Sequence, residues 1–158
     1  MKTLLSIFIV CVLFFGCKKY PEDEQFINLK TPENRLAKYT LWRLTKYTVD
    51  GADSIPYINS KVWSGFPLDK IEFDFKETDR KDPVIKINSI GGTSLIYIKF
   101  VDRKRKLSIA FNPTTSGYTY PLFLSGWNDW EISKLENGIF IIDLTKNLKK
   151  YHIEFRKV

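Results

Sequence analysis

Apolar and polar residues alternate along most of this chain, and that alternation predicts strands with one buried face and one solvated face. It is clearest in residues 71–76, where an isoleucine and two phenylalanines share a face and the residues between them are charged. A short edge strand is also expected at residues 55–58, because Pro56 cannot donate a hydrogen bond to a ladder. The main strands expected are residues 39–49, 71–76, 84–90, 94–102, 107–111, 129–135, 139–144 and 150–157.

Short turn sequences join these segments and indicate how the strands are connected. Asp50-Gly51, Gly91-Gly92 and Asn137-Gly138 are signals typical of β-hairpins. No helical periodicity of useful length falls between the strands. We therefore expect an all-β domain, an antiparallel up-and-down barrel of eight strands.

One short helical turn is expected before the first strand. Thr31 suits the N-cap position, Pro32 suits the first helical position, and Glu33 falls in the first turn. The turn is expected to continue to about Lys38.

The positions predicted to face the barrel interior are mostly bulky. An eight-stranded barrel is just wide enough to be filled by its own side chains or to hold one small ligand. A large central cavity is therefore not expected, and a ligand site is expected at the mouth. The inward positions are Trp42, Phe73, Phe75, Ile85, Ile87, Ile98, Phe100 and Phe155.

The first seventeen residues follow a different pattern. Lys2 gives a positive start, residues 4–15 are apolar except for Ser6, and the small residue Gly16 precedes Cys17. This arrangement is typical of a secretory signal. As a helix, the apolar run reaches about 18 Å, which is shorter than the roughly 30 Å hydrocarbon core of a bilayer. A membrane-spanning helix is therefore the weaker interpretation.

Gly16-Cys17 resembles the end of the lipobox in bacterial lipoprotein signals, where a small residue precedes the cysteine that carries lipid. Phe14 and Phe15 depart from the leucine and small residue that are usual there. The resemblance implies that Cys17 receives a diacylglyceryl group, that the chain is cut before it, and that the new amine is acylated. An ordinary secretory signal with an incidental cysteine is the alternative. Cys11 leaves with the signal, so the mature chain has no disulfide and no cysteine metal site.

These features divide the chain into three parts: a lipoprotein signal at residues 1–16, a lipidated cysteine with a polar tether at residues 17–31, and a barrel domain at residues 32–158. The tether contains the acidic cluster Glu22-Asp23-Glu24, which resembles a surface-export signal of some Gram-negative lipoproteins. A solvated linker is the alternative interpretation.

Two parts of the domain carry a family resemblance. Residues 41–51, LWRLTKYTVDG, together with residues 130–135, 139–144 and 151–157, resemble the bacterial lipocalin-like lipoprotein family. The middle of the chain shares only the strand spacing. The resemblance implies an eight-stranded barrel with Trp42 low in the core. It implies little about function, because most of these proteins have no established ligand, and the cysteine pair frequent in the family is absent here.

The chain is basic, with a formal net charge of +7 and a pI near 9.3. For an exported lipoprotein we expect no nucleic-acid partner, and a basic surface suits anionic lipid headgroups or acidic glycans. The densest run, Arg103-Lys104-Arg105-Lys106, falls at a hairpin tip and is the candidate contact for such a surface. A solvated turn whose charges discourage edge pairing is the alternative.

Aromatic residues make up 15% of the chain, and several fall in predicted loops or at strand ends. Rings at a barrel mouth can stack on sugar rings or cover an apolar ligand. They can equally plug the end of the barrel. The candidate mouth aromatics are Tyr57, Trp63, Phe66, Tyr118, Tyr120 and Trp127.

Few residues offer catalytic chemistry. His152 is the one histidine, and it is expected on the outward face of its strand. Glu72 and Asp74 share a strand face, but a glycosidase pair would have to face inward, and this face is expected to be solvated. No zinc spacing, phosphate loop or Gly-x-Ser-x-Gly motif occurs. We therefore expect no enzymatic activity, no metal and no cofactor.

One short pattern suggests a covalent modification. Asp53-Ser54-Ile55 resembles an O-glycosylation acceptor used in some Gram-negative periplasms. Three residues also match by chance often, so the alternative is an unmodified turn. The mass of the intact protein distinguishes the two.

Together these features predict a lipid-anchored lipoprotein of the cell envelope, held at the outer membrane on a face that the sequence leaves open. Its barrel is expected to be non-catalytic and to bind a small apolar or glycan ligand at the mouth. The alternative is a structural or protein-interaction component of the envelope, such as an adaptor or an inhibitor.

Overall fold

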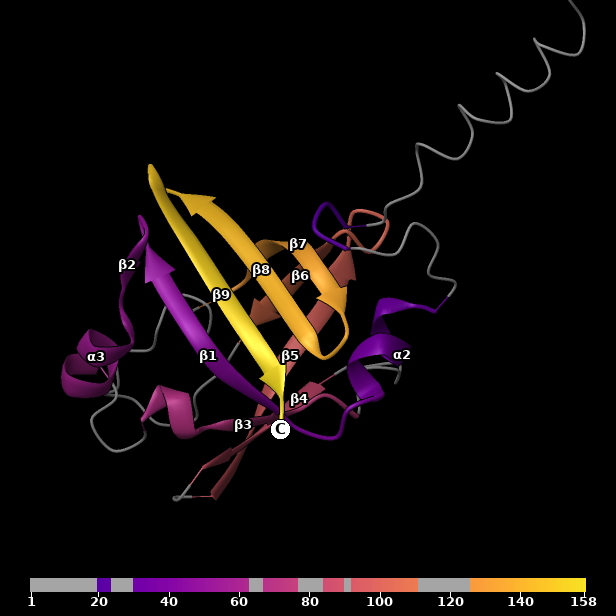
Figure 1. The fold of residues 1–158 in the computed structure, drawn as a ribbon, viewed down its shortest axis with the longest axis horizontal. Coiled ribbons are helices and arrows are strands. Elements are labelled where there is room, and N and C mark those ends of the chain that lie inside the picture. Colours follow the sequence, from indigo (N-terminus) through magenta and orange to yellow (C-terminus); the bar gives the residue numbers. More distant parts are fainter. Residues whose placement is uncertain (1–19, 24–29, 63–66, 77–83, 90–91, 111–125) are drawn as a thin grey trace, which may run out of the picture.

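The computed structural model describes residues 20–23, 30–62, 67–76, 84–89, 92–110 and 126–158. Most of them lie in one antiparallel sheet that curls into a barrel (Figure 1). The helical elements are α2 (Pro32–Ala37), α3 (Ile55–Tyr57), η1 (Ile58–Val62) and η2 (Leu68–Lys70). The strands are β1 (Trp42–Val49), β2 (Ala52–Asp53), β3 (Glu72–Asp74), β4 (Val84–Ser89), β5 (Gly92–Val101), β6 (Lys106–Ala110), β7 (Asn128–Glu136), β8 (Ile139–Lys146) and β9 (Lys149–Lys157).

Strand order confirms the predicted up-and-down barrel. The strands follow one another in sequence order from β3 to β9, and β1 pairs with both β3 and β9 to close the ring. Among the described strands, the short β2 pairs only with the end of β1 and stands outside the ring of eight. Because every strand of a closed barrel has two neighbours, the fold removes most of the free edges at which sheets associate.

The barrel has two ends, which we name by what covers them. At the α2 end, β1 and β8 begin and β7 and β9 finish, so Trp42 pairs with Lys157 and Glu136 pairs with Ile139. At the far end, β1 and β8 finish and β9 begins. Helix α2 lies beside the α2 end, whereas β2 and α3 lie at the far end (Figure 1).

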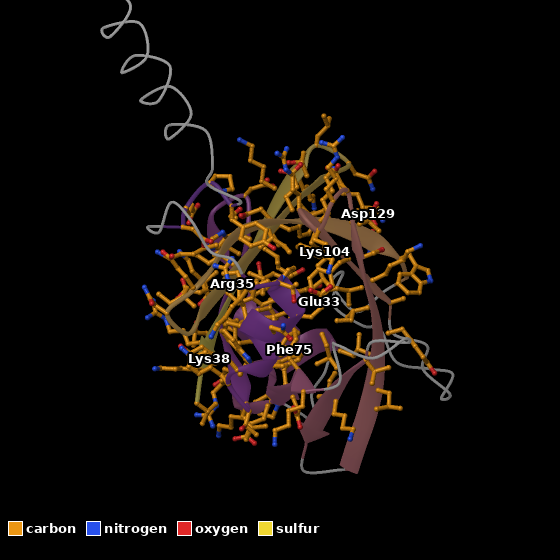
Figure 2. All side chains as sticks on the ribbon, turned by 90° about the vertical axis from the view of Figure 1, so that its right-hand side faces the viewer. Glu33, Arg35, Lys38, Phe75, Lys104 and Asp129 are labelled. Carbon is orange, nitrogen blue, oxygen red and sulfur yellow. The ribbon has the colours of Figure 1, made fainter. Side chains whose placement is uncertain are left out.

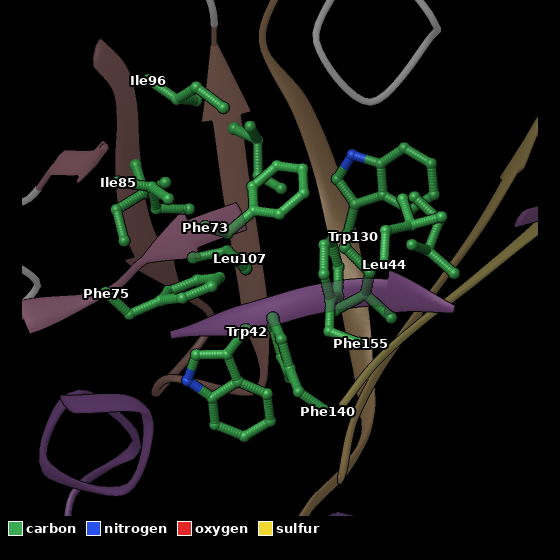
Figure 3. Packing of buried hydrophobic residues seen from close by; sticks show 14 of the residues in the cluster. Trp42, Leu44, Phe73, Phe75, Ile85, Ile96, Leu107, Trp130, Phe140 and Phe155 are labelled. Atoms are coloured by element: carbon green, nitrogen blue, oxygen red, sulfur yellow. The ribbon is translucent and has the colours of Figure 1, made fainter. Parts of the chain in front are cut away.

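The interior of the α2 half is filled by aromatic rings, as Figure 3 shows. The ring of Trp42 lies 6.1 Å from that of Phe75 and 6.2 Å from that of Phe140, both in edge-on contact. Phe155 stacks on Phe140 at 5.5 Å and meets Phe73 at 5.1 Å. Such pairs add to the free energy gained by burying the rings. Of the eight bulky inward positions predicted from the sequence, seven are buried in one core, and Phe100 is partly buried against it.

A β-bulge changes which residues of β1 face inward. The sequence pattern places Tyr47 on the face opposite Leu44, but Leu44 pairs with Phe155 and Tyr47 pairs with Ile153, both inward residues. Thr45 is the extra residue between them. Tyr47 is therefore buried in the core, and the prediction for this side chain is wrong.

The two predicted elements before and after β1 have different outcomes. Helix α2 is confirmed, and Thr31 caps it by accepting a hydrogen bond from the Asn34 amide. The edge strand expected at residues 55–58 is wrong, since this segment is helical. Pro56 occupies the start of that helix, where a missing N–H costs nothing, and Asp53 Oδ1 accepts the Ile55 amide at 3.0 Å.

Candidate functional site

A short piece of chain before α2 packs against the barrel wall, and we call Tyr20–Asp23 the docked segment. The Tyr20 hydroxyl donates to the Lys104 carbonyl at 3.0 Å, in the turn between β5 and β6. The Glu22 amide donates to the Ser133 carbonyl at 2.9 Å, on β7. Figure 1 shows this segment in indigo beside the β5–β6 turn. Tyr20 is fully buried, and burial raises the pKa of its hydroxyl.

A buried ion pair fixes the end of the docked segment. Asp23 Oδ2 lies 2.6 Å from Arg35 Nη2 on α2, and both side chains are at most 5% exposed. Asp23 Oδ1 accepts a second hydrogen bond, from the Leu135 amide at 2.8 Å. Burial raises the pKa of Asp23, and these two bonds partly offset that effect. One carboxylate therefore joins the docked segment, α2 and β7.

This arrangement corrects the expected polar tether within residues 17–31. The hydrophobic ring of Tyr20 and the paired carboxylate of Asp23 are buried, so neither belongs to a solvated linker. Asp23 is also not available as part of an exposed acidic cluster for surface export. Glu24 and Cys17 lie outside the described residues.

Helix α2 closes the barrel end through two polar contacts. The indole Nε1 of Trp42 donates to the Leu36 carbonyl at 3.1 Å, which ties the helix to the core. Glu33 Oε1 lies 2.7 Å from Lys104 Nζ, which ties the helix to the β5–β6 turn. Burial alone would raise the pKa of Glu33, but hydrogen bonds that include one from Lys104 hold this pKa below its ordinary value.

A pocket of about 200 Å³ lies where α2 meets the β7–β8 turn. Three of its wall residues are cationic and one is acidic. Gly138 in the turn has a φ of +75°, and a β-carbon there would lie 2.5 Å from Lys157 Cδ, so the Lys157 stem crosses the turn closely. The wall is formed by Lys30, Arg35, Lys38, Tyr39, Trp42, Leu135, Glu136, Asn137 and Gly138.

The predicted basic run is divided by the structure. Arg103 and Arg105 are exposed in the β5–β6 turn at the α2 end. Lys104 is half-buried and pairs with Glu33, and Lys106 lies in β6 at 3.7 Å from Glu131. Arg103 and Arg105 are therefore placed for contact with an outside surface, whereas Lys104 secures α2.

Two of the six candidate mouth aromatics can be located. Tyr57 in α3 and Trp127 just before β7 are 65% and 60% exposed, and both belong to the far end. They do not plug the barrel. The other four, Trp63, Phe66, Tyr118 and Tyr120, lie outside the described residues.

The candidate catalytic groups lie on the outer surface of the barrel. Glu72 pairs with Arg43 at 3.2 Å, and Asp74 accepts the Lys76 amide at 2.9 Å, while Phe73 between them points inward. These carboxylates therefore do not form the inward pair that a glycosidase would need.

His152 takes part in a hydrogen-bonded group that the sequence pattern did not indicate. Its Nδ1 lies 2.8 Å from Asp143 Oδ1, and the Ser133 hydroxyl donates to the other oxygen of Asp143. The carboxylate thus stands between the hydroxyl and the imidazole. In a nucleophilic triad the imidazole stands in the middle, so this order does not activate the serine.

Ser54, the residue predicted to accept a glycan, lies between β2 and α3. Ser54 donates to the Ala52 carbonyl at 3.3 Å and is partly exposed, and its glycosylation stays a prediction. Within the described ranges, no group of three or more histidine, cysteine and acidic side chains converges on a metal site. In the same ranges no helix has the length and apolarity to span a bilayer.

The closed antiparallel ring of eight strands, with a helix at one end and Trp42 low in its core, is consistent with a lipocalin-like fold. No protein-family model matches the chain, and no curated protein matches it either.

The docked segment and the pocket are the parts of the site that sequence patterns missed. Asp23 and Arg35 are 12 residues apart, and their pairing depends on how α2 lies on β7. The signal that could have indicated it is Tyr20, a large ring inside an otherwise polar stretch.

Proposed function

We propose that this protein is a lipid-anchored lipoprotein of the cell envelope, with a non-catalytic lipocalin-like domain that binds a ligand at the far end of its barrel. The observation that carries the proposal is the docked segment, which begins three residues after Cys17. Three extended residues span about 10 Å. A lipid on Cys17 would therefore hold the α2 end of the barrel close to the bilayer.

The sequence before the docked segment supports the anchor. The short apolar run and the Gly16-Cys17 pair match the resemblance to lipoprotein signals. Each buried CH₂ of an attached chain contributes about 0.8 kcal/mol, so several acyl chains give lasting attachment. The outer membrane of a Gram-negative envelope is the proposed location.

The far end is the proposed ligand site because it carries exposed aromatic rings and lies opposite the end that the proposed anchor would hold at the membrane. Tyr57 and Trp127 leave more than half of their surfaces in solvent. The rings that fill the α2 half of the interior favour a ligand at the mouth over one in the centre. Exposed aromatic faces suit the apolar faces of sugar rings or a small apolar molecule.

Lipidation is tested by the mass of the N-terminal fragment of the protein purified from a Gram-negative host. The expected fragment begins at Cys17 and carries diacylglyceryl and acyl groups. Cys17→Ser should lose these groups and the detergent-phase partition that they cause. A fragment that begins elsewhere, or an unmodified Cys17, contradicts the anchor.

Ligand binding at the far end is tested with a panel of envelope and host glycans and of small apolar probes. Tyr57→Ala and Trp127→Ala should each weaken the binding of a detected ligand by about 0.5–1.5 kcal/mol or more, the range for aromatic contacts beyond the burial of their area. Tyr39→Ala, at the α2 end, is the control and should leave binding unchanged. Equal losses in all three variants contradict a site at the far end.

A second candidate function, a protein-interaction component, has one observation in its favour. Leu95 and Tyr97 are alternate residues of β5 on its outer face, and they are 44% and 47% exposed. Exposed apolar side chains that lie together suit a protein partner. Leu95→Ser with Tyr97→Ser should abolish co-purification of an envelope protein if this candidate is correct, and should leave the far-end ligand unaffected.

A further inference from the structure

The pocket at the α2 end has the composition of a site for a small anion. Its wall contains Lys30, Arg35 and Lys38 against one carboxylate, that of Glu136. Glu136 is itself buried, with Lys134 Nζ 3.8 Å away, so its charge is partly balanced from outside the wall. The volume of about 200 Å³ corresponds to several water molecules, at about 30 Å³ for each.

Arg35 is a wall residue with a buried hydrogen-bond donor that is not satisfied. Its Nη2 is bonded to Asp23, but its Nη1 is buried and has no hydrogen-bond partner among the described residues. The side chain is only 5% exposed. A buried donor without an acceptor has lost its hydration without a replacement, and this loss is greater when the donor is charged. An oxyanion that entered the pocket would supply an acceptor at this wall.

One further ammonium group, that of Lys157, lies near the wall residue Tyr39, as that of Lys38 does. Lys38 Nζ and Lys157 Nζ each lie 5.1 Å from the centre of the Tyr39 ring. Both lysines are exposed, and Tyr39 is itself part of the wall. Contact with a ring face favours an ammonium position near the ring. Figure 2 labels Arg35, which belongs to α2, and Lys38, which directly follows the helix.

The docked segment brings the pocket close to the proposed anchor. Arg35 and Leu135 contact Asp23 and also form part of the pocket wall. The segment starts at Tyr20, and Cys17 can be no more than about 10 Å of chain away. The pocket therefore belongs to the end of the barrel that a lipid on Cys17 would turn toward the headgroups.

We propose that this pocket binds the phosphate group of an anionic lipid headgroup in the membrane that carries the protein. The inference rests on the proposed lipid anchor, which supplies the nearby bilayer. Arg35 and Lys38 attract the phosphate, and the exposed Arg103 and Arg105 of the same end add to the attraction of the surface. Basic clusters of this kind are drawn to the negative surface potential of anionic lipid.

The test uses the full-length protein in lipid nanodiscs of phosphatidylcholine with an increasing share of phosphatidylglycerol. Hydrogen exchange of the peptide that contains Glu136, Asn137 and Gly138 is followed by mass spectrometry. Exchange should slow as the share of phosphatidylglycerol rises and should reach a plateau. Lys38→Glu should raise the half-saturating share about tenfold, the effect of losing about 1.4 kcal/mol.

Lys149→Glu is the matched control, because it makes the same charge change at an exposed lysine of the far end. It should leave the half-saturating share unchanged. The proposal is overturned if the peptide exchanges equally in discs with and without phosphatidylglycerol. It is also overturned if Lys38→Glu and Lys149→Glu change the half-saturating share equally. If inorganic phosphate added to phosphatidylcholine discs protects the same peptide equally well, the ligand is a free phosphate and the lipid source is wrong.

This readout does not depend on the chemistry of the anchor. Wild type and Cys17→Ser are each mixed with preformed discs and measured in the same way, so pocket protection is followed with and without lipid on Cys17. Failure of the pocket proposal therefore appears in hydrogen exchange, and failure of the anchor appears in the mass of the N-terminal fragment.

Discussion

The two ends of this barrel are built in opposite ways. At the α2 end, a helix, a docked segment and a buried ion pair cover the core, and Trp42 donates its indole hydrogen to Leu36. At the far end, Tyr57 and Trp127 remain in solvent, and Leu148 in the β8–β9 turn is almost fully exposed. The α2 end is stabilised by contacts between residues far apart in the sequence, whereas the far end exposes large apolar side chains. The contacts that stabilise the fold and the exposed rings that we propose as a ligand site thus lie at opposite ends of the barrel.

The largest effect should come from removing the ring at the centre of the α2 end. Trp42→Ala deletes a fully buried indole that contacts Phe75 and Phe140, and it should cost about 3–5 kcal/mol of unfolding free energy. Urea denaturation followed by circular dichroism measures this loss. A cost below 1 kcal/mol would show that the α2 end does not govern stability.

The next largest effect concerns the ion pair that fastens the docked segment. Asp23→Ala leaves the Arg35 guanidinium buried without its carboxylate, which should cost about 3 kcal/mol. Replacing both residues, with Asp23→Ala and Arg35→Met, should recover much of that loss because no charge then stays buried. Urea denaturation of both variants measures the difference. If the double variant is no more stable than Asp23→Ala, the lost stability does not come from the buried, unpaired charge of Arg35.

A smaller effect depends on pH. Because the pKa of Glu33 is lowered in the fold, its ion pair with Lys104 adds stability above the ordinary value of 4.5 and loses it as the pH falls through the lowered value. Lys104 is partly exposed, so the contribution should stay below about 1 kcal/mol at pH 7. The difference in unfolding free energy between wild type and Glu33→Gln should therefore shrink between pH 5 and pH 3.

The effect of Glu33 must be taken from the difference in unfolding free energy between wild type and Glu33→Gln, because the pH dependence of wild type alone also contains the effect of Asp23. The raised pKa of Asp23 acts in the other direction, since it adds stability as the pH falls through that value. A Glu33→Gln difference that stays constant with pH would contradict the assigned role of Glu33.

The smallest effect on stability is expected at the far end. Trp127→Ala removes a ring that is mostly in solvent, so the unfolding free energy should change by no more than about 0.5 kcal/mol. Thermal denaturation beside Trp42→Ala makes this a matched pair of tryptophan deletions. If Trp127→Ala destabilises the fold as much as Trp42→Ala, the far end is part of the core and not a surface for ligands.

The strand pattern could be predicted because it is local. Alternation located the eight strands of the ring to within a few residues, and the bulky inward positions formed the core as expected. The bulge at Thr45 could not be predicted, because an extra residue becomes visible only when Tyr47 is paired with Ile153 across the sheet.

The site was harder to predict than the fold because its contacts join distant parts of the chain. Glu33 was expected only as a helix-start residue, and its partner Lys104 was expected only as a surface charge. Asp23 was expected in solvent because the residues around it are polar. Its burial follows from the fit of α2 and β7, which no local pattern encodes.

Ring closure between β1 and β9 also governs the timing of folding. Thr45 donates a hydrogen bond to the Glu154 carbonyl, a contact between residues 109 positions apart in the sequence. Folds rich in such distant contacts form slowly, because the chain must lose much entropy before the contacts are made. The first strand of the ring can pair with its second neighbour only after the last strand has been synthesised, so a chain still in synthesis has no closed barrel.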